Sequence, residues 1–331
     1  MTFASLIVPA FNSERTLART LTALLAQSYP EFEIIIVDDG ATDGTARIAT
    51  EFTADPRVRL IRQSNRGLAG ARNTGIAAAR GDVIGFCDAD DLWLPEKLGR
   101  HVAHLAANPH VGVSYSGSAM IDDDGQLLTQ AQRPKLTGIC AATIFKRNPV
   151  GNGSAVVLRR ETLEAIAHTP HQDSGRTWYF DETFRQSEDI ECWLRIALGT
   201  EWVFEGIPGL LTQYRISAGG LSAATDKQLA AWERMVAKLD LLNPAFFAVN
   251  TAAARAYQLR YLSRRAVSDL DGPRAFTLSR EWLATSRLPL IEEPVKSVVS
   301  LCAAAVLSSF GPASFKKAMS FMQRKSCEGV N

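Results

Sequence analysis

The sequence predicts an α/β protein, in which a mostly parallel central sheet with flanking helices is followed by an all-helical C-terminal region. Short apolar runs alternate with helical patterns over the first hundred residues, which is typical of right-handed βαβ units. Carboxylates follow directly after two of these apolar runs, and the pattern from residue 226 onward is almost entirely helical. We therefore divide the 331-residue chain into residues 1–222 and residues 223–331.

The first strand, residues 5–8, ends at Pro9, because proline cannot continue a central ladder. Ser13 is expected to cap the next helix, whose leucines recur on one face. Glu-Ile-Ile-Ile-Val at residues 33–37 is the clearest buried strand and ends at Asp39 and its neighbours. Further strands are expected at residues 58–61, 83–87 and 111–116, with helices at residues 45–52 and 98–107 and an alanine-rich helix that ends near residue 80.

Three carboxylates follow the strand at residues 83–87, namely Asp88, Asp90 and Asp91. Open α/β sheets bind ligands at the carboxyl ends of their strands. Hard oxygen ligands at such a position suit Mg²⁺ or Mn²⁺ holding a diphosphate. The alternative is an acidic turn in which Asp90 or Asp91 caps the helix that begins near Pro95.

Residues 65–73 combine glycines, which allow a ligand to approach the backbone closely, with Arg72, which could reach an anion. The stretch lacks Gly-x-Gly-x-x-Gly and follows the third strand, so it is not a dinucleotide fingerprint. Capping and packing remain an equal alternative for these residues.

The middle of the chain contains a helix start that carries two acids, Glu188 and Asp189. A favourable interaction with the helix dipole is the simplest explanation for them. Asp122 and the two aspartates after it have hairpin chemistry and are interpreted as a solvated turn. Short strands are expected at residues 154–158, 202–204 and 211–214, and helices at residues 226–242, 245–268, 272–286, 292–309 and 313–324.

Composition limits the possible partners. With 46% hydrophobic and 21% charged residues and a net charge of +1, the chain has an ordinary globular composition and gives no reason to expect nucleic-acid binding. From Arg255 onward there are twelve basic and six acidic residues, whereas residues 1–254 hold 24 basic and 29 acidic ones. A basic C-terminal part suggests an anionic partner such as a membrane face, with packing of these helices on residues 1–222 as the alternative.

Five cysteines without Cys-x-x-Cys spacing are typical of reduced thiols, and we find no secretion signal at the N-terminus. No stretch is expected to approach the ~20 apolar residues of a spanning helix, and residues 298–310 come closest. We therefore expect a cytoplasmic protein. Its last helices could attach it peripherally to the inner face of the cell membrane.

Five motifs in this order resemble the family 2 glycosyltransferases, which are inverting enzymes with the A-type glycosyltransferase fold of nucleotide-diphospho-sugar transferases. The matching stretches are Ile-Val-Pro-Ala-Phe-Asn at residues 7–12, Ile-Val-Asp-Asp-Gly-Ala-Thr-Asp-Gly at 36–44, Gly-Ala-Arg-Asn at 70–73, Asp-Ala-Asp-Asp at 88–91 and Glu-Asp at 188–189. The resemblance covers about two thirds of the chain, and residues 223–331 match no family that we can name.

The resemblance implies a nucleotide pocket at the ends of the first strands. Asp39 would accept a hydrogen bond from the base, which is expected to be uracil. Pro9, Ala10 and Phe11 would line the base and ribose, and Arg72 would help to hold the nucleotide. The implied donor is thus a nucleotide sugar, most simply a UDP-sugar.

The resemblance also implies the chemistry. Asp88 would contact the ribose or donor sugar, and Asp90 would ligate a Mg²⁺ or Mn²⁺ ion that bridges the diphosphate. Asp189 would be the general base that deprotonates the acceptor hydroxyl, while Glu188 would position the acceptor. Many relatives carry a histidine where this chain has Ser217, so the sequence does not identify the group that takes the place of this histidine beside the metal. The acceptor would be a saccharide or a lipid-linked sugar in cell-surface polysaccharide or glycolipid synthesis.

Three alternatives compete with this interpretation. A non-catalytic nucleotide-sugar-binding relative or scaffold would be expected to have lost Asp90 or Asp189. A phosphorelay receiver needs an aspartate after the third strand, where this chain has Arg62 and two uncharged residues. A nucleotidyltransferase would usually show a glycine-rich phosphate loop after the first strand, and residues 9–12 are not one.

Overall fold

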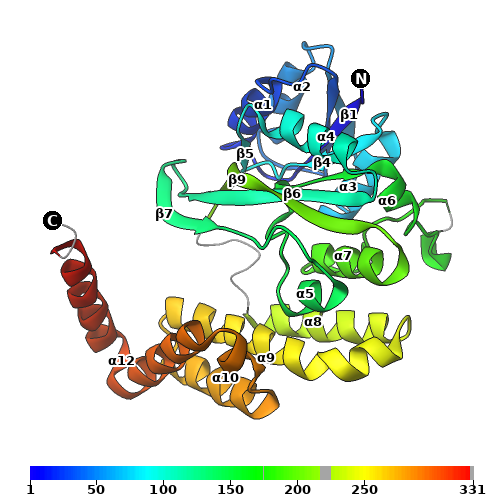
Figure 1. Ribbon diagram of the computed structural model, residues 1–331. Helices are drawn as coiled ribbons and strands as arrows, with labels where there is room; N and C mark the ends of the chain where they lie inside the picture. Colours follow the sequence, from blue (N-terminus) through cyan, green and yellow to red (C-terminus); the bar gives the residue numbers. More distant parts are fainter. Residues whose placement is uncertain (174, 217–224, 329–331) are drawn as a thin grey trace. The chain divides into compact units, whose positions relative to one another are not determined.

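The computed structural model describes residues 1–173, 175–216 and 225–328 (Figure 1). The chain forms two compact units. The first consists of Met1–Ile144 and Asn148–Gly220, and the second of Phe145–Arg147 and Leu221–Asn331. The boundary that we expect between residues 222 and 223 lies outside the described residues.

The first unit is built on a mixed sheet, which among the described residues has nine strands in the order β3-β2-β1-β4-β8-β6-β9-β5, with β7 paired to β6. The strands are β1 (Ala4–Ala10), β2 (Phe32–Asp38), β3 (Val58–Arg62), β4 (Val83–Phe86), β5 (Leu92–Trp93), β6 (Val111–Ile121), β7 (Leu127–Gln132), β8 (Val156–Arg159) and β9 (Val203–Arg215). Strands β1 to β4 pair in parallel, as the alternating pattern predicts, and β6 and β9 are parallel as well. Antiparallel pairs join β8 to β4 and β6, β7 to β6, and β5 to β9.

Helices cover both faces of the parallel part. In β2, Ile34 and Ile36 pack in the cluster that includes the apolar sides of α1, α2 and α4, whereas Ile35 and Val37 pack with Ala71 of α3. Every residue of β2 is therefore buried, which explains the uninterrupted apolar run in the sequence. The helices of this unit are α1 (Leu17–Leu25), α2 (Thr45–Phe52), α3 (Gly67–Ala78), α4 (Lys97–Ala107), α6 (Arg160–Glu164) and α7 (Glu188–Gly199); α5 (Ala141–Lys146) begins in it.

The structure confirms the α/β fold and corrects three local expectations. Ser13 does not cap α1 with its side chain; its backbone carbonyl accepts from the amides of Thr16 and Leu17 instead. The two short strands expected near the end of the unit are one continuous strand, β9, with register shifts against β6. A further short strand, β5, which was not expected from the sequence, lies between the acidic loop and α4. It forms because Leu92 and Trp93 pair with β9.

The second unit is helical, as the sequence predicts. Its helices are α8 (Thr225–Asp240), α9 (Pro244–Ser268), α10 (Gly272–Thr285), α11 (Leu288–Glu292) and α12 (Pro294–Glu328). Its main hydrophobic cluster joins α9, α10 and α12 around the buried Trp282. Helix α12 is interrupted at Gly311, which has a φ of 75°, just before Pro312. This interruption agrees with the break expected between residues 309 and 313.

The expectation that no stretch approaches a membrane-spanning length is wrong. Pro294–Lys317 of α12 is long and apolar enough to cross a membrane, judged by length and composition alone, with a mean hydropathy of 1.7 in its most apolar part. Only 22% of that part is buried. The three serines of residues 298–310 do not end the apolar stretch, because serine lowers the hydropathy of a helix only slightly.

Candidate active site

The three carboxylates after β4 have different environments. Asp91 is fully buried; one of its oxygens accepts from the Ser154 hydroxyl at 2.6 Å and the other from the Arg215 amide at 2.9 Å. Neither Asp90 nor Asp91 caps α4, whose N-terminal flank is Glu96, so the capping alternative is wrong. Asp91 instead ties the acidic loop to β9 and to the chain before β8.

Asp90 and Asp88 are the two partly accessible carboxylates of the loop. The backbone carbonyl of Asp90 accepts from the Arg215 side chain at 2.9 Å. Burial, together with the neighbouring charge of Asp88, raises the pKa of Asp90 to about 6. The cluster therefore carries more negative charge than its surroundings neutralise, which is an electrostatic environment that favours a bound cation.

Arg72, on α3, connects this loop to α7. Its guanidinium donates to Asp88 Oδ1 at 3.0 Å and to Glu188 Oε1 at 2.9 Å, and it lies over the rings of Phe86 and Phe180. The side chain is only 2% exposed. Gly153 packs directly against it, since a Cβ at that position would lie 2.3 Å from the guanidinium. Arg72 is therefore held in one orientation, and its two hydrogen bonds fix Asp88 and Glu188 relative to each other.

Glu188 and Asp189 begin α7, directly after Ser187, which has a φ of 63°. Burial raises the pKa of Glu188 to about 7, although Arg72 opposes the shift. Burial also raises the pKa of Asp189, against the lowering effects of Arg72 and of the Ile190 amide. Removal from water therefore affects the pKa of Asp189 more than Arg72 and the neighbouring amides do.

The nucleotide residues expected from the sequence lie at the ends of β1 and β2. Pro9 and Ala10 are buried within β1, whereas Phe11, just beyond it, is half exposed. The Asp39 carboxylate accepts from the Gln63 side chain at 2.6 Å and from two amides at the start of α3, those of Arg66 and Gly67, at 2.8 Å each. Asp39 therefore also holds the N-terminus of α3.

The residues before β8 were missed by sequence reasoning. Asn148 donates to Asp189 Oδ2 at 3.2 Å, and the Ser154 hydroxyl accepts from the Asp88 amide at 2.9 Å while it donates to Asp91. Residues 153–155 form a 3₁₀ turn where a strand was expected. Asn, Gly and Ser are enriched at residues 148–154, but such residues also form ordinary loops, so the sequence contained no distinctive signal.

Tyr214 is the last residue but one of β9. Burial, followed by the carboxylates of Asp91, Asp88, Asp90 and Asp189, raises the pKa of Tyr214. The acidic loop and the start of α7, which are about a hundred residues apart in the sequence, are joined by Arg72, which donates to Asp88 and to Glu188. Ser217, where relatives carry a histidine, lies outside the described residues.

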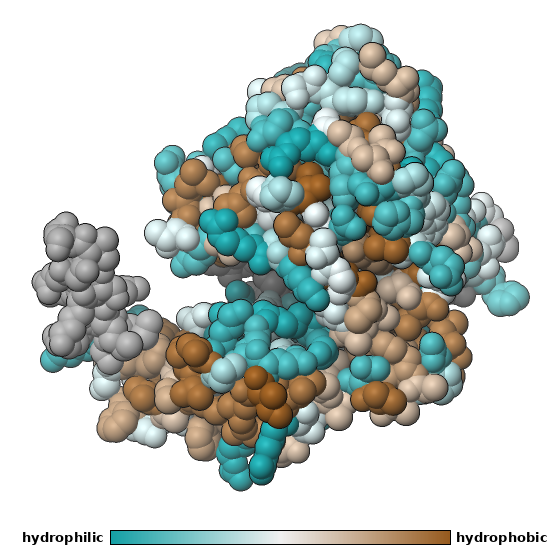
Figure 2. All heavy atoms as spheres, in the orientation of Figure 1, coloured by the Kyte–Doolittle hydropathy of each residue, from teal (hydrophilic) through white to brown (hydrophobic). Residues whose placement is uncertain are grey.

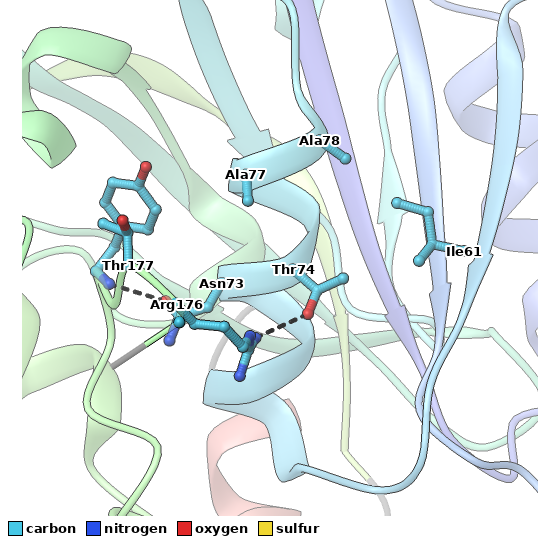
Figure 3. A pocket seen from close by; sticks show the side chains of 9 residues that line it. Ile61, Asn73, Thr74, Ala77, Ala78, Arg176 and Thr177 are labelled. Carbon is cyan, nitrogen blue, oxygen red and sulfur yellow. Dashed lines mark hydrogen bonds between the residues drawn. The ribbon is translucent and has the colours of Figure 1, made fainter. Parts of the chain in front are cut away.

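A separate groove of about 570 Å³ lies along α3 (Figure 3). Arg176 donates to the Thr74 hydroxyl at 3.1 Å, and the Tyr179 amide donates to Asn73 Oδ1 at 3.0 Å. None of the site residues expected from the sequence lines this groove, whose full lining is Ile61, Asn73, Thr74, Ala77, Ala78, Gly175, Arg176, Thr177 and Tyr179. We therefore do not assign the chemistry to it.

Comparison with known sequences agrees with this geometry. Residues 5–167 match the family model described as glycosyl transferase family 2. An uncharacterized glycosyltransferase of a Nostoc species is 38% identical over 172 residues, which cover 49% of this chain and 52% of that protein. The chain thus spans about half the length of that relative.

A longer match is to an Escherichia coli enzyme, UDP-Glc:alpha-D-GlcNAc-diphosphoundecaprenol beta-1,3-glucosyltransferase WfgD. It is 27% identical over 226 residues, which cover 68% of this chain and 81% of that protein.

Solved structures show the same fold. Residues 1–349 of TarS from S. aureus, in complex with UDP-GlcNAc, match 93% of this chain and 92% of that chain with a TM-score of 0.59 and 18% identity. The mannosyltransferase PcManGT from Pyrobaculum calidifontis, in complex with GDP-Man and Mn²⁺, matches 93% of this chain and 87% of that chain with a TM-score of 0.56 and 21% identity.

Proposed function

Because residues 5–167 make the chain a member of glycosyl transferase family 2, we propose that it transfers a sugar from a UDP-linked donor to a hydroxyl acceptor with inversion at the anomeric carbon. The observation that carries the proposal is the bridge that the buried Arg72 makes between Asp88, in the acidic loop with Asp90, and Glu188, at the start of α7 with Asp189. The test is an assay of released nucleotide with a panel of nucleotide sugars that includes UDP-glucose and UDP-N-acetylglucosamine.

The donor set fits a divalent cation. Described residues contain no cluster of three or more metal-ligating side chains, but Mg²⁺ and Mn²⁺ on a diphosphate commonly use one or two carboxylates and take the other ligands from phosphate and water. Asp90 would hold the cation, beside the charge of Asp88. When bound, such a cation neutralises charge that develops on the diphosphate leaving group.

The remaining roles follow from position. Asp189 accepts the proton of the acceptor hydroxyl; its raised pKa brings its basicity closer to what proton abstraction near neutral pH requires. Asp88 contacts the donor sugar or ribose. Its carboxylate is held by Arg72 and its backbone amide by the Ser154 hydroxyl. Glu188 positions the acceptor and balances the charge of Arg72. Pro9, Ala10 and Phe11 line the base and ribose.

Asp39 supplies a testable contact to the base. In the described part of the chain, its Oδ2 accepts only from Gly67, so one acceptor position remains for the N–H of uracil. We expect Asp39→Ala to weaken UDP binding by about 1.5–3 kcal/mol, measured by calorimetry. It should also lower the melting temperature, since the start of α3 loses its acceptor.

The neighbouring carboxylate provides a matched control for this experiment. Asp38 is equally buried and accepts from the Ala41 amide at 3.0 Å. Asp38→Asn should leave UDP affinity unchanged. Equal UDP affinity in wild type and Asp39→Ala would show that the base is recognised elsewhere.

A non-catalytic nucleotide-sugar-binding relative, or a scaffold in a polysaccharide-synthesis complex, is the competing function. Either would bind UDP-sugars without turnover at any cation concentration. The intact pair of Asp90 and Asp189, each held in a structured environment, favours the enzyme.

We further propose that the acceptor is a saccharide carried on a membrane lipid and that α12 binds the membrane surface from the cytoplasmic side. Apolar side chains at spacings of three, four and seven residues are exposed along α11 and α12, namely Ile291, Val295, Val298, Val299, Val306 and Phe310. Figure 2 shows hydrophobic residues gathered on the surface of the helical unit. Lys296, Lys316 and Lys317 lie within or next to the stretch and would contact anionic headgroups.

Flotation with vesicles that contain an anionic phospholipid tests this binding. We expect wild-type protein to float with the vesicles at low salt and Val295→Asp/Val299→Asp to stay in the soluble fraction, since two charges on the apolar stripe oppose insertion. Leu127→Asp, at an exposed apolar position in the first unit, is the matched control and should float. Failure of the wild type to bind at any salt concentration would contradict the membrane proposal.

A further inference from the structure

An arginine from the loop before α7 lies against the first residue of α3. Arg185 packs so closely on Gly67 that a Cβ at position 67 would lie 3.1 Å from the Arg185 Cζ, with Nη1 nearer still. Gly67 also has a φ of 78°, which residues with a side chain rarely adopt. The Arg185 guanidinium therefore occupies the space that a side chain at position 67 would fill.

Gly67 is also the residue that holds the Asp39 carboxylate. Its amide donates to Asp39 Oδ2 at 2.8 Å. Asp39 and Arg185 thus contact the same glycine, and both belong to the first compact unit. An ionised carboxylate only accepts hydrogen bonds and a guanidinium only donates them. The carboxyl end of β2 therefore presents an acceptor and a donor beside each other.

The charge of Arg185 is not balanced by a carboxylate in the part of the chain that the structure describes. The neighbouring arginines differ in this respect. Arg66 pairs with Glu182 at 3.0 Å, and Arg72 is buried between two carboxylates. Arg185, by contrast, is exposed to solvent. Its guanidinium can therefore donate to a bound molecule without breaking an ion pair.

An acceptor beside a donor is complementary to one edge of uracil. In uracil N3–H donates and the adjacent O4 accepts, whereas in cytosine N3 accepts and the N4 amino group donates. When N3–H lies on Asp39, O4 lies on the next ring atom along the same edge, on the side where Arg185 can donate. Cytosine in this position would place a lone pair against the carboxylate and N–H groups against the guanidinium.

We propose that Arg185 donates a hydrogen bond to O4 of the donor's uracil, and that Asp39 and Arg185 together select uracil over cytosine. The inference rests on the proposed function, in which Asp39 binds the nucleobase. It adds to the nucleotide pocket a specificity-determining residue from a segment about 120 residues farther along the chain than α3. The loop before α7 thus contacts the nucleobase, and the first turn of α7 carries the proposed general base.

Calorimetry with UDP and CDP on the full-length protein tests this role. We expect wild type to bind UDP at least about tenfold more tightly than CDP. Arg185→Ala should bind UDP about tenfold more weakly than wild type does, the effect of losing a hydrogen bond from a charged group, while its affinity for CDP does not fall. Its melting temperature should equal that of wild type, because the side chain is exposed and unpaired in the described structure.

The two nucleotides distinguish a contact to the nucleobase from a contact to the phosphates. UDP and CDP carry the same ribose and diphosphate, so the loss of a phosphate contact would weaken both to the same extent. Equal losses for UDP and CDP in Arg185→Ala, or no loss for either, would overturn the proposal.

Arg57→Ala is the matched control. Arg57 directly precedes β3, at the end of the parallel strands opposite to the nucleotide residues, and pairs with Asp55 at 2.8 Å. This variant removes the same charge from the same unit and should leave the affinities for UDP and CDP unchanged. A loss of UDP affinity equal to that of Arg185→Ala would show that net charge is responsible, and would overturn the proposal.

Asp39→Ala separates failure of this inference from failure of the proposed function. A wild type that binds no UDP, or normal UDP affinity in Asp39→Ala, refutes the nucleotide site and the inference with it. Weakened UDP binding in Asp39→Ala, together with equal losses for UDP and CDP in Arg185→Ala, refutes only the role of Arg185.

Discussion

Asp189→Asn is expected to lower kcat by a factor of about 10² or more while UDP binding survives, because the variant lacks a group that can accept a proton from the acceptor hydroxyl. The substitution keeps the size of the side chain. Its amide can satisfy only one of the two donors that the carboxylate satisfies, the Ile190 amide and the Asn148 side chain, so a small loss of stability is also expected. Release of UDP gives kcat, and calorimetry with UDP gives the affinity.

The pH profile adds a second measurement. Burial holds the pKa of Asp189 above its ordinary value, so the acidic limb of the wild-type kcat profile should lie above the range of a free aspartate. Near-normal kcat in Asp189→Asn would exclude Asp189 as the base. Glu188 would then be the next candidate, whereas Glu191, in the same helix, is fully buried and accepts from Arg195 at 2.7 Å. Loss of UDP binding together with kcat would point to a structural role.

Asp90→Ala is expected to abolish cation-dependent turnover, and excess chelator should do the same to the wild type. The fold should survive, because the substitution keeps the backbone carbonyl that accepts from Arg215. Titration with Mn²⁺ and assay of UDP release measure the effect. Asp124→Ala, in the exposed turn after β6, removes a carboxylate of the same charge and should leave turnover unchanged. Full activity of Asp90→Ala, or of the wild type in chelator, would contradict the metal role.

Thermal unfolding at several pH values tests the same residue without substrate. The folded-state pKa of Asp90 is raised from 3.8 to about 6, so the protonated form is favoured by folding. Its contribution to stability is present at low pH and is lost as the pH rises through about 6. In cation-free buffer at pH 7, Asp90→Ala should therefore melt no lower than wild type. Asp91→Ala should melt lower, because it leaves Ser154 and the Arg215 amide without their acceptor.

Much of the fold could be predicted from local patterns. The strands of the parallel half and the helices between them begin and end within a few residues of their expected bounds, because β1, β2 and β4 are buried on both faces and the helices carry an apolar side. The pairing of β9 was not predictable in this way. Its two apolar stretches are separated by Pro208 and Gly209, which usually end a strand, and only the register shifts against β6 accommodate them.

Local patterns were sufficient to predict the α/β class, the helical C-terminal region and the residue types of the proposed chemistry, because periodicity and motif order can be read along a chain without its fold. The environments of these residues depend on how distant segments pack. Asp91 is structural and Asp90 accessible, although they are neighbours, because only Asp91 points into the core against Ser154. Arg72 binds Asp88 and Glu188, and Asn148 binds Asp189, across 16 to 116 residues of sequence. Burial and hydrogen bonding between such distant segments exist only after the sheet has formed, so no local pattern can encode where these charges meet.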